Sequence, residues 1–183
     1  MNVALILLAS ALGTATQPLQ TGTSEILIQF VPRTPDQMSS FYEARGFPQA
    51  MLEKLKHQCF ITVRIHNTSQ KIIWLELENW EFSSNGQAVM REHRNTWKQR
   101  WQEMNIPLRF QSTFRWTLLP ETLDYLPNER EGGNIILPRN NHPGINQAIT
   151  LKASFKTGHN KQGPVIHIEY DKLHCIENAA EEN

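Results

Sequence analysis

The sequence has no excess of charge of either sign, few cysteines and no apolar run long enough to cross a membrane. Eighteen Lys and Arg side chains balance eighteen Asp and Glu side chains in 183 residues. A neutral chain lacks the electrostatic field that attracts nucleic acid or an anionic membrane surface, so we expect neither as a partner. A transmembrane helix needs about 20 apolar residues, and the almost unbroken apolar run from Val3 to Leu12 is too short.

Sequence motifs of catalysis are missing as well. There is no Gly-x-Ser-x-Gly elbow, no His-Glu-x-x-His helix and no glycine loop that could cradle a phosphate. Gly132-Gly133 precedes an apolar run and predicts a turn leading into a strand. The seven histidines never recur at the i, i+2 or i, i+4 spacing typical of metal ligands. We predict no enzyme activity, no cofactor and no metal site, with His66, His167 and Glu169 as the weak candidates for a metal.

The N-terminus has the pattern of a secretory leader. The first 24 residues carry no charged side chain, and small residues follow the apolar run from Val3 to Leu12. An apolar segment followed by a small-x-small site predicts a leader over residues 1–15, cleaved after Ala11 or Ala15. A buried N-terminal strand is the alternative. A cleaved leader would place the protein outside the cytoplasm, periplasmic or secreted, with no transmembrane anchor.

Only two cysteines are present, Cys59 and Cys175, and both lie downstream of the predicted leader. In an oxidising compartment an even pair most simply forms one disulfide, and two buried free thiols are the alternative. Cys59 shares a strand face with Ile61, Val63 and Ile65, so it should point into the core in either case.

Alternation of apolar and polar residues dominates the remaining chain and predicts antiparallel strands with one wet face. The alternating segments are 25–30, 59–66, 110–118, 149–156 and 166–170. The alternation slips by one residue near Glu78-Asn79, which predicts a β-bulge or a strand break. Ser84-Asn85-Gly86 predicts a hairpin with a type I′ turn, because Asn and Gly both tolerate positive φ.

Two helical insertions interrupt the strands. Thr34-Pro35-Asp36-Gln37 is a capping box that predicts a helix ending near Arg45 and Gly46, and a short second helix begins at Pro48. The second insertion is predicted over residues 95–104, where two tryptophans and a methionine recur at helical spacing.

These elements predict a mainly β protein, an antiparallel β-sandwich with two short helical insertions; an α+β open sheet is the alternative. One domain should cover residues 24–176, followed by an acidic flexible tail over residues 177–183. Cys59 and Trp74 are spaced in a way that resembles the strand-B cysteine and strand-C tryptophan of immunoglobulin domains. The resemblance is short, since Cys175 comes too late for that family and Leu173 stands in place of its tyrosine. It implies an immunoglobulin-like architecture and says nothing about activity.

The function that these patterns favour is a non-catalytic binding or accessory module for another envelope or secreted component. The alternatives are a small extracytoplasmic hydrolase with a composite His/Glu/Arg site and a periplasmic metal-binding protein. Long irregular loops often carry function, and residues 119–144 form the least regular stretch. We therefore predict a partner surface from Phe41 and Tyr42 in the first insertion together with Asn140 and Asn141.

Overall fold

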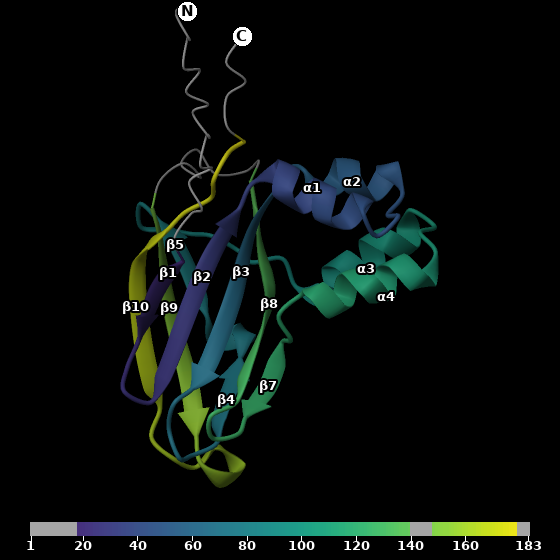
Figure 1. The fold of residues 1–183 in the computed structure, drawn as a ribbon. Coiled ribbons are helices and arrows are strands. Elements are labelled where there is room, and N and C mark those ends of the chain that lie inside the picture. Colours follow the sequence, from purple (N-terminus) through teal and green to yellow (C-terminus); the bar gives the residue numbers. More distant parts are fainter. Residues whose placement is uncertain (1–17, 140–147, 179–183) are drawn as a thin grey trace, which may run out of the picture.

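Alternating apolar residues build a first sheet of four antiparallel strands in the computed structural model, which describes residues 18–139 and 148–178 (Figure 1). Its strands, in the order β1-β2-β3-β8, are β1 (Leu19–Gly22), β2 (Ile26–Arg33), β3 (Gln58–Asn67) and β8 (Arg130–Pro138). Every second side chain of β2 and β3 points inward and is buried, as the period of a strand requires. The leader predicted over residues 1–15 lies outside the described residues.

A second antiparallel sheet packs against the inner face of the first. Its strands are β4 (Ile73–Glu76), β5 (Glu81–Ser84), β6 (Gln87–Ala88), β7 (Thr122–Tyr125), β9 (Ile149–Thr157) and β10 (Ile166–Leu173). Five of them follow the order β6-β5-β9-β4-β7, and β10 pairs with β9. Ile, Leu, Val and Phe side chains of both sheets form the core between them. The predicted antiparallel β-sandwich is thereby confirmed. Trp74, the residue of the immunoglobulin resemblance, is half-buried and lies outside this core.

The slip in alternation corresponds to a strand break. The short 3-10 helix η1 (Leu77–Asn79) separates β4 from β5, so that apolar side chains on both sides of the break reach the same core. The predicted hairpin joins β5 to β6, with Asn85 and Gly86 both at positive φ, 50° and 76°. A second 3-10 helix, η2 (His159–Lys161), connects β9 to β10.

Three helices form where the sequence predicted them. Helix α1 (Pro35–Glu43) has the reciprocal capping box of Thr34 and Gln37, and α2 (Gln49–Leu55) follows Pro48. Helix α3 (Arg94–Glu103) buries Trp97 and Trp101 on one face. These three helices confirm the sequence signals of caps and helical spacing.

A fourth helix contradicts the sequence prediction. Residues 110–118 were expected to form a strand, yet Leu108–Thr117 is helix α4. The apolar residues of this segment fit both periods, and Phe110 and Phe114 are four residues apart on one helical face. Pro107 stands at the N-cap, where a helix tolerates it. Trp116, which a strand would have buried beside Phe114, is 85% exposed.

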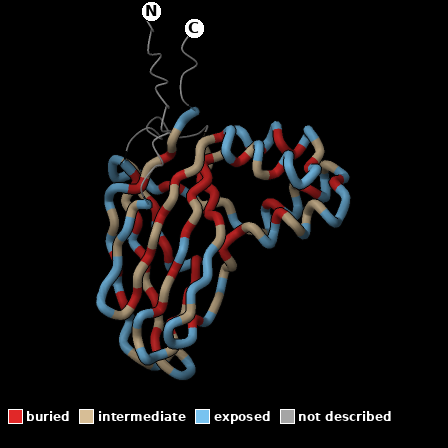
Figure 2. The backbone as a smooth tube through the Cα atoms, viewed as in Figure 1, coloured by how far each residue is buried: buried red, intermediate tan, exposed pale blue. Residues whose placement is uncertain are grey.

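The four helices form a lobe with its own core beside the sandwich (Figures 1 and 2). Tyr42, Trp97, Trp101 and Phe114 are all less than 2% exposed and meet at the centre of this core. The lobe packs on the outer face of β3 and β8, where it covers Phe60 and Ile136. Both faces of the first sheet are therefore buried at this end.

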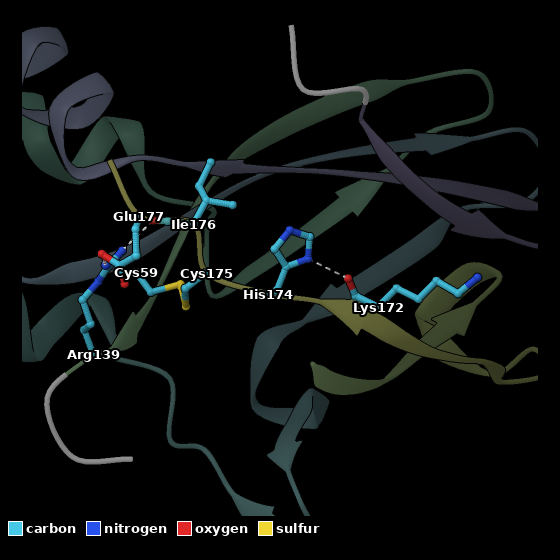
Figure 3. The surroundings of a disulfide bond; sticks show 7 residues. All are labelled: Cys59, Arg139, Lys172, His174, Cys175, Ile176 and Glu177. Atoms are coloured by element: carbon cyan, nitrogen blue, oxygen red, sulfur yellow. Dashed lines mark hydrogen bonds and ion pairs between the residues drawn. A yellow bond between two sulfur atoms is a disulfide. The ribbon is translucent and has the colours of Figure 1, made fainter. Parts of the chain in front are cut away.

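A disulfide joins Cys59 at the start of β3 to Cys175, just past β10 (Figure 3). This is the pairing that the sequence predicted. Of the acidic tail predicted over residues 177–183, the structure describes only residues 177 and 178, and both contact other parts of the chain. Glu177 forms an ion pair with Arg139, and the Asn178 side chain accepts a hydrogen bond of 3.0 Å from the backbone N–H of Asp36.

The stretch 119–144 is more regular than predicted over its described part. Strands β7 and β8 occupy much of it, and Gly132-Gly133 lies inside β8, not in a turn. The two glycines allow close packing of backbones. A Cβ atom on Gly132 would lie 2.3 Å from the Val63 carbonyl oxygen, and one on Gly133 would lie 2.4 Å from the Leu119 nitrogen. Asn140 and Asn141 fall outside the described residues.

Candidate binding groove on the outer sheet face

A groove of about 800 Å³ lies over the outer face of the first sheet. Outward side chains of β2, β3 and β8 form its floor, and α1 and α4 form its wall. We call it the outer-sheet groove. Its floor includes Gln29, Arg64 and Arg130, and its wall includes Phe41 and Trp116. Its volume lies within the range of about 300–1,000 Å³ that is usual for ligand sites.

The strand register determines which side chains share the groove floor. Gln29, Arg64 and Gly132 stand side by side across three strands, and His66 stands opposite Arg130 in the next outward row. Because Gly132 has no side chain, the middle of the β8 segment leaves the floor open. The helices cover the row of Phe60 and Ile136, so the groove occupies the part of the sheet face beyond the lobe.

A chain of hydrogen bonds fixes the end of the groove that adjoins the lobe. Arg33 Nε donates to Thr62 Oγ1 at 3.0 Å, and Thr62 Oγ1 donates to Asn134 Oδ1 at 2.8 Å. Thr117 Oγ1 donates to the Phe114 carbonyl oxygen, so it accepts the bond of 2.7 Å from the Tyr42 hydroxyl. Both threonine hydroxyl protons are therefore committed to acceptors.

Tyr42 does not belong to a partner surface, contrary to the sequence prediction. Its side chain is 0% exposed, and burial raises the pKa of its hydroxyl well above the usual range despite the bond to Thr117. Tyr42 is thus a neutral donor that joins α1 to α4. Phe41, its neighbour in the predicted surface, is half-buried and lines the outer-sheet groove, with the Arg45 guanidinium over its ring.

Three arginine side chains reach the groove from three adjacent strands. Arg33 has one side-chain hydrogen bond, to Thr62, while Arg64 and Arg130 are exposed and form no side-chain hydrogen bond or ion pair with other residues that the structure describes. None of the Lys–carboxylate and Arg–carboxylate pairs in that part of the chain includes any of the three. The groove therefore presents guanidinium groups that are free to bind a ligand.

The weak metal candidates do not come together. His66 lies on the outer face of the first sheet, with its Nε2 atom 3.1 Å from Asn128 Oδ1. His167 and Glu169 lie on β10 in the second sheet and alternate with the buried Ile166 and Ile168, so they face the solvent on the other side of the sandwich. Over residues 18–139 and 148–178, no group of three or more His, Cys, Asp or Glu side chains is placed to hold a metal ion.

Comparisons with known proteins are distant. No protein-family model matches the chain, and no curated protein matches it significantly. A solved structure from Bacillus subtilis, given as a putative lipoprotein, is similar over 84% of this chain with 8% identical residues and a TM-score of 0.43. The matched region spans 38% of that longer protein. A likeness at this level carries no functional information, so function rests on the groove and the disulfide.

The disulfide indicates an extracytoplasmic protein, because such bonds persist where thiols are not kept reduced. None of the helices in the described ranges is long and apolar enough to span a membrane.

Sequence reasoning missed most of the groove. Arg64 was correctly predicted as a solvent-facing position of an alternating strand. Alternation does not indicate, however, which solvent-facing surface forms a groove. Trp116 was assigned to a strand and thereby to the core. The signal that could have found it is the i, i+4 spacing of Phe110 and Phe114, which predicts a helix whose apolar face points away from Trp116.

Proposed function

We propose that the protein is an exported, non-catalytic binding module, periplasmic or secreted, that holds a ligand of the cell envelope or its surroundings in the outer-sheet groove. The observation that carries this proposal is the groove itself, an open hollow of about 800 Å³ whose arginines have no acidic partners among the described residues. A rigid sheet forms its floor, which favours binding because little ordering entropy is lost. Export through the leader over residues 1–15 is part of the proposal.

Hydrolysis, the alternative function, has less support from the groove. A hydrolase needs a nucleophile next to a base, or two carboxylates that flank a bond. The hydroxyl groups of Thr62 and Thr117 donate to Asn134 and to a carbonyl oxygen, so neither is held by a base. Glu131 is the one carboxylate among the described groove residues. These contacts favour binding over bond cleavage.

The test is retention of envelope and secreted components of the source organism by immobilised protein. Gln29→Trp would fill the groove floor with a bulky side chain, and Gln87→Trp makes the same change in the exposed β6 hairpin. We expect one or more components to bind the wild type and Gln87→Trp and to be lost from Gln29→Trp.

Equal retention by all three proteins would contradict a binding role for the groove. Turnover of a retained component, abolished by His66→Gln or Glu131→Gln, would replace the binding role with the hydrolase alternative. Circular dichroism of both tryptophan variants controls for folding.

A further inference from the structure

From the charges and shape of the outer-sheet groove we infer that its ligand is an acidic oligosaccharide, a short chain of sugar rings that carry carboxylates. This inference rests on the proposed function, because it names the ligand class of the same groove. The argument uses three features of the groove: the distribution of its arginines, the exposed aromatic side chain on its wall and the chemistry of its floor.

The arginines are spread along the groove rather than gathered at one point. Arg64 and Arg130 are diagonal neighbours on β3 and β8, about 7–8 Å apart at the backbone. Arg33 pairs with Phe60, four residues from Arg64 along β3, which corresponds to about 13 Å. A chain with repeated negative charges can contact arginines spread in this way, whereas a single small anion would require the side chains to converge on one point. Guanidinium groups bind carboxylates through two parallel hydrogen bonds, which suits such a chain.

Trp116 offers an aromatic face to a ligand. It is 85% exposed on the wall formed by α4, and it is the most exposed of the large apolar side chains that the structure describes. A ligand that covers this ring removes apolar surface from water, which favours binding. The flat C–H faces of sugar rings pack on tryptophan, so a carbohydrate can cover Trp116 while its carboxylates reach the arginines.

The floor distinguishes a carbohydrate from an acidic peptide. Peptides in grooves of β proteins commonly add a strand, which requires unpaired backbone N–H and C=O groups. The outer-sheet groove lies on the face of β2, β3 and β8. Strands β2 and β3 are paired on both sides, and β8 is the edge strand, so an added peptide strand would lie beside β8 and not on the groove floor. The floor instead offers neutral side-chain amides such as Gln29, whose donors and acceptors match hydroxyl groups. A carbohydrate uses these groups better than a peptide backbone does.

Trp116 provides a direct measure of binding. The other four tryptophans are buried or half-buried, so a ligand in the groove changes chiefly the emission of Trp116. The probe is tetragalacturonate, and its fully methyl-esterified form keeps the sugar chain but removes the charge. A tetraglutamate peptide tests the competing class. We expect tetragalacturonate to shift the tryptophan emission of the wild type and to leave that of the Trp116→Phe variant unchanged. Its affinity for the wild type should fall as the salt concentration rises.

The variants isolate the role of charge. Arg64→Gln combined with Arg130→Gln should weaken binding of tetragalacturonate by at least about tenfold, since charge-assisted bonds are lost. Lys152→Gln combined with Lys172→Gln removes the same charge from exposed positions in the second sheet and should leave affinity unchanged. Neither pair disturbs folding, because none of the four side chains is buried.

Each other outcome overturns the inference. Equal binding of the methyl ester refutes the role of the arginines, tighter binding of tetraglutamate refutes the sugar, and no binding of any probe refutes the ligand class. The proposed function survives these results if the immobilised wild type still retains a component that Gln29→Trp loses. If Gln29→Trp retains the same components as the wild type, the proposed function is refuted together with the inference.

Discussion

The sandwich core and the lobe core lie on opposite faces of the same sheet and are built from different side chains. The sandwich core consists mainly of Ile, Leu and Val from alternating strands, whereas aromatic side chains from α1, α3 and α4 form the centre of the lobe core, beside Met and Leu side chains of α2. Strands β3 and β8 belong to both. Where the helices cover them, Phe60 and Ile136 are buried on the outer face, and the alternation gives way to continuous apolar runs. Where the helices end, the outer face is polar and becomes the groove.

The first sheet therefore serves two purposes along its length. Its inner face closes the sandwich, and its outer face first anchors the lobe and then forms the groove floor. The lobe therefore acts as the wall of a binding site as well as a covering layer. Its attachment to the sheet through few strand residues suggests that it opens as a separate unit.

Phe114→Ala should have the largest effect on stability, and it should act on the lobe core more than on the sandwich core. Phe114 is 1% exposed, and its ring centroid lies 5.3 Å from those of both Trp97 and Trp101. Removing a buried phenylalanine costs about 3–5 kcal/mol of unfolding free energy. We expect urea unfolding to show this loss and hydrogen exchange to accelerate in α3 more than in β9.

The half-buried Phe110 on the same helix provides the matched control, and Phe110→Ala should cost clearly less. Equal acceleration of exchange in α3 and β9 after Phe114→Ala would mean that lobe and sandwich unfold as one unit.

Removing the disulfide should act on the sandwich instead. Cys59 and Cys175 are separated by 116 residues, so the bond restricts a large part of the unfolded chain. The double variant Cys59→Ser, Cys175→Ser should lose about 2–4 kcal/mol of global stability, measured by denaturant unfolding. Local opening of α3 should keep its free energy. An unchanged unfolding midpoint in both the variant and the reduced wild type would refute this expectation.

A smaller effect is expected at the end of the sandwich far from the lobe. Hydrogen bonds from Lys156, at 2.7 Å, and from Lys161 lower the pKa of Glu76 from 4.5 to about 2. A depressed folded-state pKa contributes stability above the unfolded pKa, and this contribution is lost as the pH falls from about 4.5 towards 2. Glu76→Gln should therefore cost about 1 kcal/mol at neutral pH and nothing near pH 2.

Thermal unfolding over a pH series measures this difference, with Glu78→Gln as the control because Glu78 is exposed and lies two residues away. A stability difference between the wild type and Glu76→Gln that stays constant with pH would contradict the role of the two lysines.

The sequence predicted most of the sandwich because its signals are local. Alternation located β2, β3, β9 and β10, and the Asn85-Gly86 turn and the Thr34 capping box were read directly from residue chemistry. Helix α4 was missed because its apolar residues fit two periods at once. Pro107 and the two phenylalanines four residues apart favour the helix, and only tertiary packing on Trp97 and Trp101 decides between the periods.

The groove was less predictable because it arises from register and from what remains uncovered. Arg33, Arg64 and Arg130 are far apart in sequence and share a face only once β2, β3 and β8 pair. Likewise, Gly132 was predicted to lie in a turn. It lies inside β8 because the backbone of Val63 comes too close for a side chain, and such a close approach leaves no pattern in the local sequence.

The disulfide between Cys59 and Cys175 also closes a covalent ring that contains α3, α4 and all strands from β4 to β10. A protease that cuts the chain once inside this ring releases no fragment, because both pieces stay linked through the sulfur atoms. A single nick therefore leaves the sandwich in one piece. This matters outside the cytoplasm, where no new protein is made to replace a cleaved one. On a gel, such a nicked protein separates into two bands only after reduction.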